Sequence, residues 1–145
     1  MKALILNSGL GSRMGVLSSE HPKCMTEINR SDTILSRQLK LLEKVGIKEV
    51  VITTGYYDRV LEDYVQSLDL PLEIRFVNNP VYDKTNYIYS IYCAKDFLRD
   101  EDLIFMHGDL VFEYSVLEII YYLLYRLLAT IPCFMSQRSC SDYYK

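Results

Sequence analysis

The first residues of the chain have the types and spacing needed to bind a polyphosphate. An apolar run over residues 3–6 leads directly into the segment Asn7-Ser8-Gly9-Leu10-Gly11-Ser12-Arg13. A buried strand that breaks into a loop of small residues directs backbone N–H groups toward one point, and an arginine adds a permanent cation. Gly9 and Gly11 carry no Cβ that would hold phosphate oxygens away from the backbone. The sequence therefore predicts a polyphosphate site at this loop.

Two common phosphate loops do not fit the segment. The dinucleotide fingerprint G-x-G-x-x-G requires a third glycine where Met14 stands, and the G-K-[S/T] of the P-loop is absent. An ordinary strand-to-helix turn is the alternative explanation for the glycines. A second cation, Lys23, follows in the dipeptide Pro22-Lys23, which is also a common loop sequence.

A carboxylate suited to metal binding follows a later strand. Asp109 ends the motif His107-Gly108-Asp109, directly after the apolar run 103–106. Mg²⁺ prefers carboxylate and phosphate oxygens, so one or two aspartates together with a triphosphate can hold it. The alternative role for Asp109 is to cap a helix, because residues 116–128 could be helical.

The elements that position these residues follow from hydrophobic periodicity. Short apolar or alternating runs predict strands, and apolar residues at helical spacing predict helices. The expected strands are 2–6, 49–54, 72–77 and 103–106, and the expected helices are 33–45, 58–68 and 86–98. This alternation predicts an α/β fold with a mostly parallel sheet. Ligands of such sheets bind at the carboxyl ends of the strands, where the candidate residues lie.

The pattern L-x-x-G-x-G-x-R followed by P-K resembles the signature of nucleotidyltransferases. The run from Asn78 to Asn86 resembles the branch of that family that includes phosphocholine cytidylyltransferases. The resemblance implies a Rossmann-like, three-layer αβα fold of the nucleotide-diphospho-sugar transferase type. It also implies transfer of a nucleotidyl group, with CTP favoured as donor, to a phosphorylated small molecule such as phosphocholine or a sugar phosphate, with release of pyrophosphate.

The same resemblance assigns roles to individual residues. It makes Arg13 and Lys23 catalytic and Asp109 a ligand of Mg²⁺. The nucleotide-binding residues that it implies are Asn7, Ser8, Gly9, Gly11, Ser12, Arg13, Asn79, Thr85, Asn86 and Ser90. Amide and hydroxyl groups suit a pyrimidine edge, which mixes donors and acceptors. Local roles remain as alternatives: a helix cap for Ser12 and an Asx-turn around Pro80 for Asn79.

The resemblance covers residues 1 to about 118. We therefore expect a nucleotide-binding part over 1–118 and an atypical apolar tail over 119–145, with the C-terminal half of the family's domain missing. A second acidic metal ligand lies in that half, so the activity of the chain is uncertain. The alternative is a truncated, inactive remnant that binds nucleotide, or an interaction domain. Such a tail could also make the protein self-associate.

Composition limits the other partners and the compartment. The net charge is −3 and lysines and arginines do not cluster, which argues against a nucleic-acid partner. The four cysteines form no C-x-x-C pair, and we expect reduced thiols in a cytoplasmic protein. Residues 116–135 are long enough to span a membrane, but Glu118, Arg126 and Pro132 interrupt them, so we do not expect a span.

Overall fold

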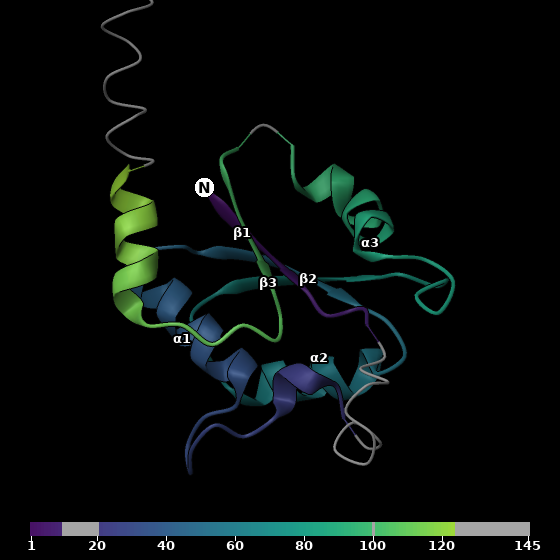
Figure 1. The fold of residues 1–145 in the computed structure, drawn as a ribbon, viewed down its shortest axis with the longest axis horizontal. Helices are drawn as coiled ribbons and strands as arrows, with labels where there is room; N and C mark the ends of the chain where they lie inside the picture. Colours follow the sequence, from purple (N-terminus) through teal and green to yellow (C-terminus); the bar gives the residue numbers. More distant parts are fainter. Residues whose placement is uncertain (10–20, 100, 124–145) are drawn as a thin grey trace, which may run out of the picture. The chain divides into compact units, whose positions relative to one another are not determined.

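A computed structural model describes residues 1–9, 21–99 and 101–123 of the chain. It divides the chain into two compact units, Met1–Val111 and Phe112–Lys145. The first unit contains the sheet, its covering helices and all the candidate site residues that the structure describes (Figure 1). In the second unit, residues 114–123 are helical. Within the described ranges, no helix has the length and apolar character needed to cross a bilayer.

The sheet has four strands, and every pairing between them is parallel. The strands are β1 (Lys2–Leu6), β2 (Glu49–Thr54), β3 (Glu73–Asn78) and β4 (Leu103–His107), in the spatial order β3-β2-β1-β4 (Figure 1). The register places Leu6 opposite both Thr53 of β2 and His107 of β4. The carboxyl ends of the strands therefore meet at one edge, and the prediction of a mostly parallel α/β sheet is confirmed.

Two amphipathic helices begin and end where the local sequence indicates. Helix α1 (Ile34–Val45) starts with a capping box in which the side chains of Thr33 and Ser36 each accept a bond from the other residue's backbone N–H. It ends at Gly46, whose φ of 95° lies in the left-handed region that favours glycine. Helix α2 (Asp58–Ser67) follows β2.

The third helix is shorter than its periodicity predicts. Helix α3 covers Tyr87–Ala94, and a 3₁₀ turn over Lys95–Phe97 follows it. The expectation of one helix over 86–98 is therefore wrong at its C-terminal end. Helices commonly tighten into a 3₁₀ turn where they end, and here Leu98, just after the turn, packs back against the core of the sheet.

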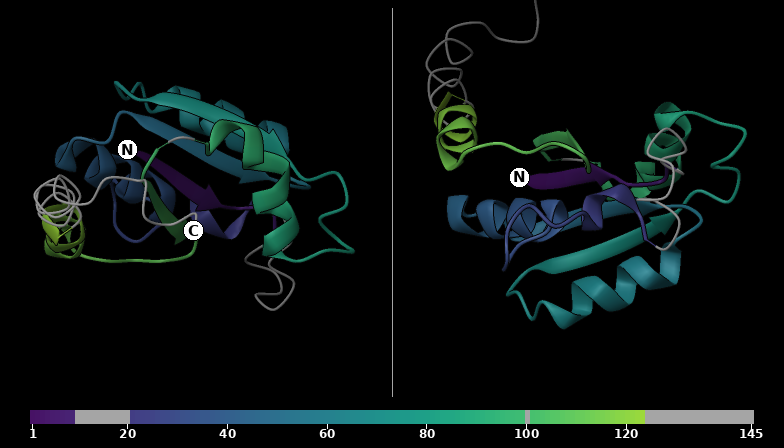
Figure 2. Two further views of the ribbon diagram at one scale, coloured as in Figure 1. Left: turned by 90° about the horizontal axis from the view of Figure 1, so that it is seen from above. Right: turned by 60° about the horizontal axis from the view of Figure 1, so that its bottom comes forward.

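The helices cover both faces of the sheet. On one face, Leu4, Leu6 and Val51 pack with Ala94 of α3. The other face of β1 and β2 is equally buried, and α1 and α2 bury their own apolar side chains on the side of the sheet away from α3 (Figure 2). The layers are therefore helix, sheet and helix, as expected for a Rossmann-like three-layer fold.

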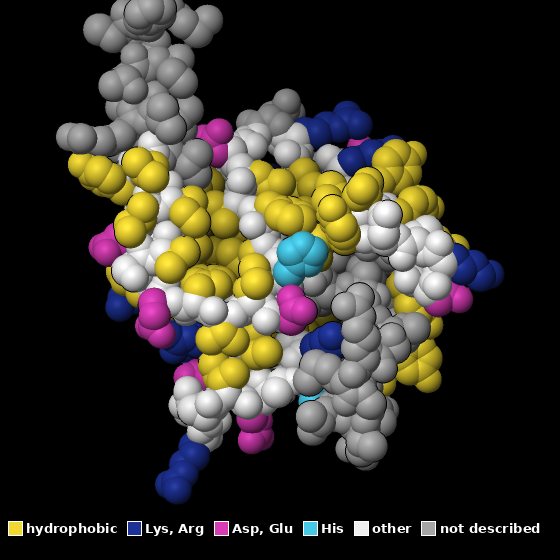
Figure 3. All heavy atoms as spheres, viewed as in Figure 1, with side chains coloured by type: hydrophobic (Ala, Val, Ile, Leu, Met, Phe, Trp, Pro, Cys, Tyr) yellow, Lys and Arg dark blue, Asp and Glu magenta, His cyan; other side chains and the backbone are white. Residues whose placement is uncertain are grey.

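Strand β4 differs from the inner strands because alternate residues are exposed. Ile104 and Met106 are buried, whereas Phe105 is 42% exposed. Among the described strands, β4 pairs only with β1. Hydrophobic side chains are accordingly visible on the surface of the molecule (Figure 3).

Candidate functional site

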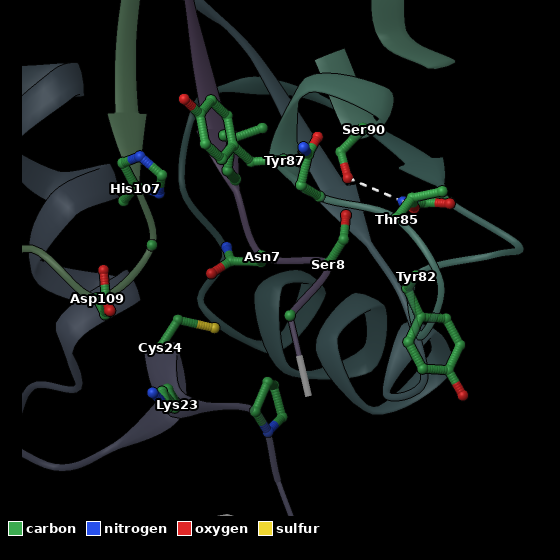
Figure 4. A pocket seen from close by; sticks show the side chains of 16 residues that line it. Asn7, Ser8, Lys23, Cys24, Tyr82, Thr85, Tyr87, Ser90, His107 and Asp109 are labelled. Carbon is green, nitrogen blue, oxygen red and sulfur yellow. Dashed lines mark hydrogen bonds between the residues drawn. The ribbon is translucent and has the colours of Figure 1, made fainter. Parts of the chain in front are cut away.

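A cavity of about 370 Å³ lies at the carboxyl ends of the strands (Figure 4). Its lining comes from the segments that follow β1, β3 and β4, from the start of α3, and from the turn at Lys23. The lining residues are Leu6, Asn7, Ser8, Gly9, Pro22, Lys23, Cys24, Asn79, Tyr82, Thr85, Asn86, Tyr87, Ser90, His107, Gly108 and Asp109. Segments far apart in the sequence thus contribute to one site.

Asn7 and Ser8 lie in the middle of the cavity in Figure 4, where β1 ends. The backbone N–H of Asn7 donates to the carbonyl oxygen of Thr53 at 3.1 Å, which ties this segment to the end of β2. Among the residues that the structure describes, neither the Asn7 amide nitrogen Nδ2 nor the Ser8 hydroxyl Oγ has a hydrogen-bond partner, although both atoms are buried. The middle of the cavity therefore contains two polar groups that the described part of the chain leaves unsatisfied.

A polar cluster around Asn79 forms one side of the cavity. The buried Asn79 amide donates to Thr85 Oγ1 and to Ser90 Oγ, both at 3.0 Å. Its oxygen accepts the backbone N–H of Val81 at 3.0 Å, which is the Asx-turn that the sequence offered as an alternative. Asn79 therefore lines the cavity while its amide is fully used in placing two hydroxyl groups there.

Asn86 and Ser90 join this cluster to helix α3. The Asn86 oxygen accepts the backbone N–H of Ile88 at 3.0 Å and caps the helix. Ser90 is 2% exposed and lies one turn further along. Its oxygen accepts from Asn79, which leaves its hydroxyl hydrogen for a ligand.

The opposite side of the cavity holds His107 and Asp109 (Figure 4). The buried Gln38 of α1 donates to the backbone oxygens of His107 at 3.0 Å and of Leu110 at 2.8 Å, and so fixes the turn that carries Asp109. The His107 ring packs edge-to-face against Tyr87, with centroids 5.5 Å apart. Asp109 caps no helix, since the next helical residue along the chain is 114.

Lys23 and Cys24 begin a 3₁₀ turn, Lys23–Met25, at the third side of the cavity. The Cys24 side chain is 1% exposed, and burial raises the pKa of its thiol to about 12. A thiol with such a pKa stays protonated at neutral pH, so Cys24 acts as a small apolar group there. Lys23 is the cation that this turn supplies.

Most of the residues predicted from the sequence lie in this one cavity. Those that the structure places in its lining are Asn7, Ser8, Gly9, Lys23, Asn79, Thr85, Asn86, Ser90 and Asp109. Gly11, Ser12 and Arg13 lie outside the described residues. Sequence reasoning missed Gln38 and Cys24, because a glutamine and a cysteine inside ordinary elements carry no local signal of a site.

A parallel α/β sheet with a polar cavity at the carboxyl ends of its strands defines a class of nucleotide-binding folds. Residues 3–128 match the family model described as MobA-like NTP transferase domain. The chain therefore belongs to the MobA-like NTP transferase domain family, and the resemblance to nucleotidyltransferases is confirmed.

Curated relatives and solved structures agree with this assignment. The chain is 36% identical over 117 residues to CTP:phosphoglutamine cytidylyltransferase of Campylobacter jejuni, a match that covers 77% of this chain and 45% of the relative. It is 31% identical over 104 residues to choline-phosphate cytidylyltransferase of Streptococcus pneumoniae, covering 72% of this chain and 43% of the relative. The inositol-1-phosphate CTP transferase from T. maritima superposes with a TM-score of 0.67 at 25% identity, covering 81% of this chain and 46% of that structure. The chain spans a little less than half the length of each of these three proteins.

Proposed function

We propose that this chain binds a nucleoside triphosphate, CTP in preference to others, and acts as a cytidylyltransferase on a phosphorylated small molecule such as phosphocholine or a sugar phosphate. The observation that carries the proposal is the cavity itself. It brings together the segment after β1, the Lys23 turn, the Asn79 cluster and Asp109, each predicted separately from the sequence. Relatives named as cytidylyltransferases support the choice of CTP and of a phosphorylated acceptor.

The reaction proposed is an in-line displacement in which the acceptor phosphate attacks the α-phosphorus of the nucleotide and pyrophosphate leaves. Little covalent chemistry falls to the protein, so catalysis depends on positioning and on charge stabilisation. Lys23 supplies positive charge at the cavity wall, and we propose the same role for Arg13 of the loop. Within the described residues, the Asn86 amide and the Ser90 hydroxyl keep N–H and O–H groups that can donate to the pyrimidine oxygen and ring nitrogen.

We also propose Asp109 as a ligand of Mg²⁺. Its carboxylate is exposed, lines the cavity and lies across it from the Asn79 cluster (Figure 4). Among the described residues, no group of three His, Cys, Asp or Glu side chains could hold a metal ion by itself. Mg²⁺ commonly takes one or two carboxylates and completes its shell with water and substrate phosphates, so a single aspartate fits this ion. The metal would offset charge on the phosphates when bound.

Calorimetry with CTP, UTP, GTP and ATP in the presence of Mg²⁺ tests the binding step. We expect CTP to bind and Lys23→Ala to weaken it. Lys48→Ala is the matched control, because Lys48 is exposed and precedes β2 at the amino end of the sheet. An absence of heat with all four nucleotides would overturn the proposal.

Release of pyrophosphate from CTP with phosphocholine or another phosphorylated acceptor tests the transfer step. Lys23→Ala should slow this release more than it weakens CTP binding if the lysine acts on the transition state.

A second candidate function is nucleotide binding without turnover. It is favoured by the coverage of the relatives, since this chain matches only 45% and 43% of two of them. In the described lining Asp109 is the sole carboxylate. We propose residues 1–118 as the nucleotide-binding part in either case. Binding of CTP with no pyrophosphate released under any acceptor would favour this second function.

A further inference from the structure

Helix α1 buries a glutamine, Gln38, among leucines. Its neighbours on the buried face of the helix are Leu35, Leu39 and Leu42, all of them fully buried. Gln38 itself is 2% exposed, and its oxygen Oε1 has no hydrogen-bond partner among the residues that the structure describes. A buried amide oxygen without a partner is destabilising, and an apolar side chain of the same shape would avoid that cost. A glutamine is therefore useful here only through its N–H groups.

Those N–H groups bind the turn that follows β4. Nε2 of Gln38 donates to the backbone oxygen of His107, the first residue of the turn, at 3.0 Å, and to that of Leu110, the last residue, at 2.8 Å. Inside the turn, the backbone N–H of Leu110 donates to the His107 oxygen at the longer distance of 3.3 Å. The amide of Gln38 thus joins the two ends of a four-residue turn in which Asp109 is the third residue.

Burial alone does not fix this turn. Residues 107–110 are exposed except for Gly108, whose backbone N–H donates to the oxygen of Leu6 in β1 at 3.0 Å. That attachment precedes Asp109 in the chain, whereas the shorter bond from Gln38 lies beyond it. Asp109 is therefore held by β1 on one side and by Gln38 on the other.

Resting on the proposed function, in which Asp109 is a ligand of Mg²⁺, we infer that Gln38 is the residue that positions this ligand. Gln38 does not line the cavity, so it acts through the backbone of the turn and touches neither nucleotide nor metal. Groups that orient a metal ligand affect metal affinity strongly, because a displaced carboxylate no longer meets the ion. Removing the Gln38 amide frees the end of the turn beyond Asp109 and leaves the rest of the cavity as it is.

Gln38→Met tests the inference, because methionine keeps the length of the side chain and removes both N–H groups. Calorimetry gives the dissociation constant of CTP with Mg²⁺ and with EDTA, and the ratio of the two measures how much the metal tightens binding. We expect Gln38→Met to reduce this ratio about tenfold, the lower end of the typical effect of losing a group that orients a metal ligand. Affinity for CTP in EDTA should match that of wild type. An unchanged ratio would overturn the inference and leave the proposed function standing.

A double-mutant cycle with Asp109→Asn distinguishes positioning of the ligand from a general structural effect. If Gln38 acts through Asp109, Gln38→Met should change the metal ratio much less in the Asp109→Asn background than in wild type. An equal change in both backgrounds would contradict the inference. Gln66→Met is the matched control, because Gln66 is exposed in the last turn of α2, which leads to the amino end of β3. It should bind CTP as wild type does under both conditions.

Thermal unfolding without ligand shows whether each variant is folded. If Gln38→Met does not fold, Gln38→Leu, which extends the leucines already on α1, takes its place with the same expected results. Failure of both variants to fold would assign Gln38 to the fold and refute the inference. If wild type binds CTP equally well with Mg²⁺ and with EDTA, the inference and the metal role of Asp109 both fail, whereas CTP binding stands. If wild type binds no CTP at all, the proposed function fails with them.

Discussion

Replacing Asn79 with alanine should destabilise the fold more than any other single amide removal at the site. Asn79 is 1% exposed and makes three hydrogen bonds, to Thr85, Ser90 and Val81, each 3.0 Å long. Each contributes a net ~1 kcal/mol, so Asn79→Ala should cost about 3 kcal/mol of the free energy of unfolding. In a domain near this size that corresponds to a Tm lower by roughly 6–12 °C.

Urea unfolding followed by circular dichroism measures this cost, with the m-value checked for a two-state transition. Asn86→Ala is the matched control, because the Asn86 side chain makes a single capping bond, to the backbone N–H of Ile88. Loss of one exposed N-cap should cost about 1 kcal/mol.

The reasoning is refuted if Asn79→Ala costs no more than Asn86→Ala. That result would mean that the polar cluster is no more stabilising than an exposed helix cap. The cluster also has a functional readout, since Thr85 and Ser90 lose their common partner in the variant. CTP affinity should therefore fall in Asn79→Ala even under conditions where the variant is fully folded.

Three further predictions concern other parts of the first unit. Gly108→Ala should cost about 1–3 kcal/mol and weaken CTP binding, because its Cβ would overlap the Asn7 amide; Gly9→Ala, whose Cβ meets nothing within 4 Å, should unfold in urea like wild type. Burial raises the pKa of the Cys24 thiol to about 12, above the ordinary value of ~8.5 that it has in the unfolded chain. The free energy of unfolding should therefore be at its full value below about pH 8.5 and should fall as the pH rises toward 12. In urea titrations above about pH 9, the free energy of unfolding of wild type should fall by up to about 1.4 kcal/mol per pH unit more than that of Cys24→Ala. Equal slopes of the free energy of unfolding against pH would show that the thiol ionises freely. Thr33→Ala removes both the helix cap and a 2.8 Å bond to the Tyr64 hydroxyl, and should cost about 1–2 kcal/mol in urea unfolding, whereas Tyr64→Phe removes the second bond alone and should cost less.

Local sequence was sufficient to predict the four strands, the three helices apart from the C-terminal end of α3, and the edge of the sheet where the site lies. The β-branched run 49–54 is β2, and Gly46 ends α1 as its C-cap because glycine adopts a positive φ without strain. Periodicity and capping depend on residues within a few positions of one another, so they can be read along the chain. The parallel arrangement then required the carboxyl ends, with Asn7, Asn79 and Asp109, to meet at one edge.

The tertiary structure decided how each polar group at that edge is used. Asn79 and Asn7 are both asparagines at strand ends, yet the Asn79 amide bonds Thr85, Ser90 and Val81, whereas Asn7 Nδ2 has no partner among the described residues. The need for glycine at position 108 also arises from Asn7, about a hundred residues earlier in the chain. Hydrogen-bond satisfaction and steric exclusion depend on which atoms lie within a few ångströms, and only the pairing of β1 with β4 and β2 brings those atoms together.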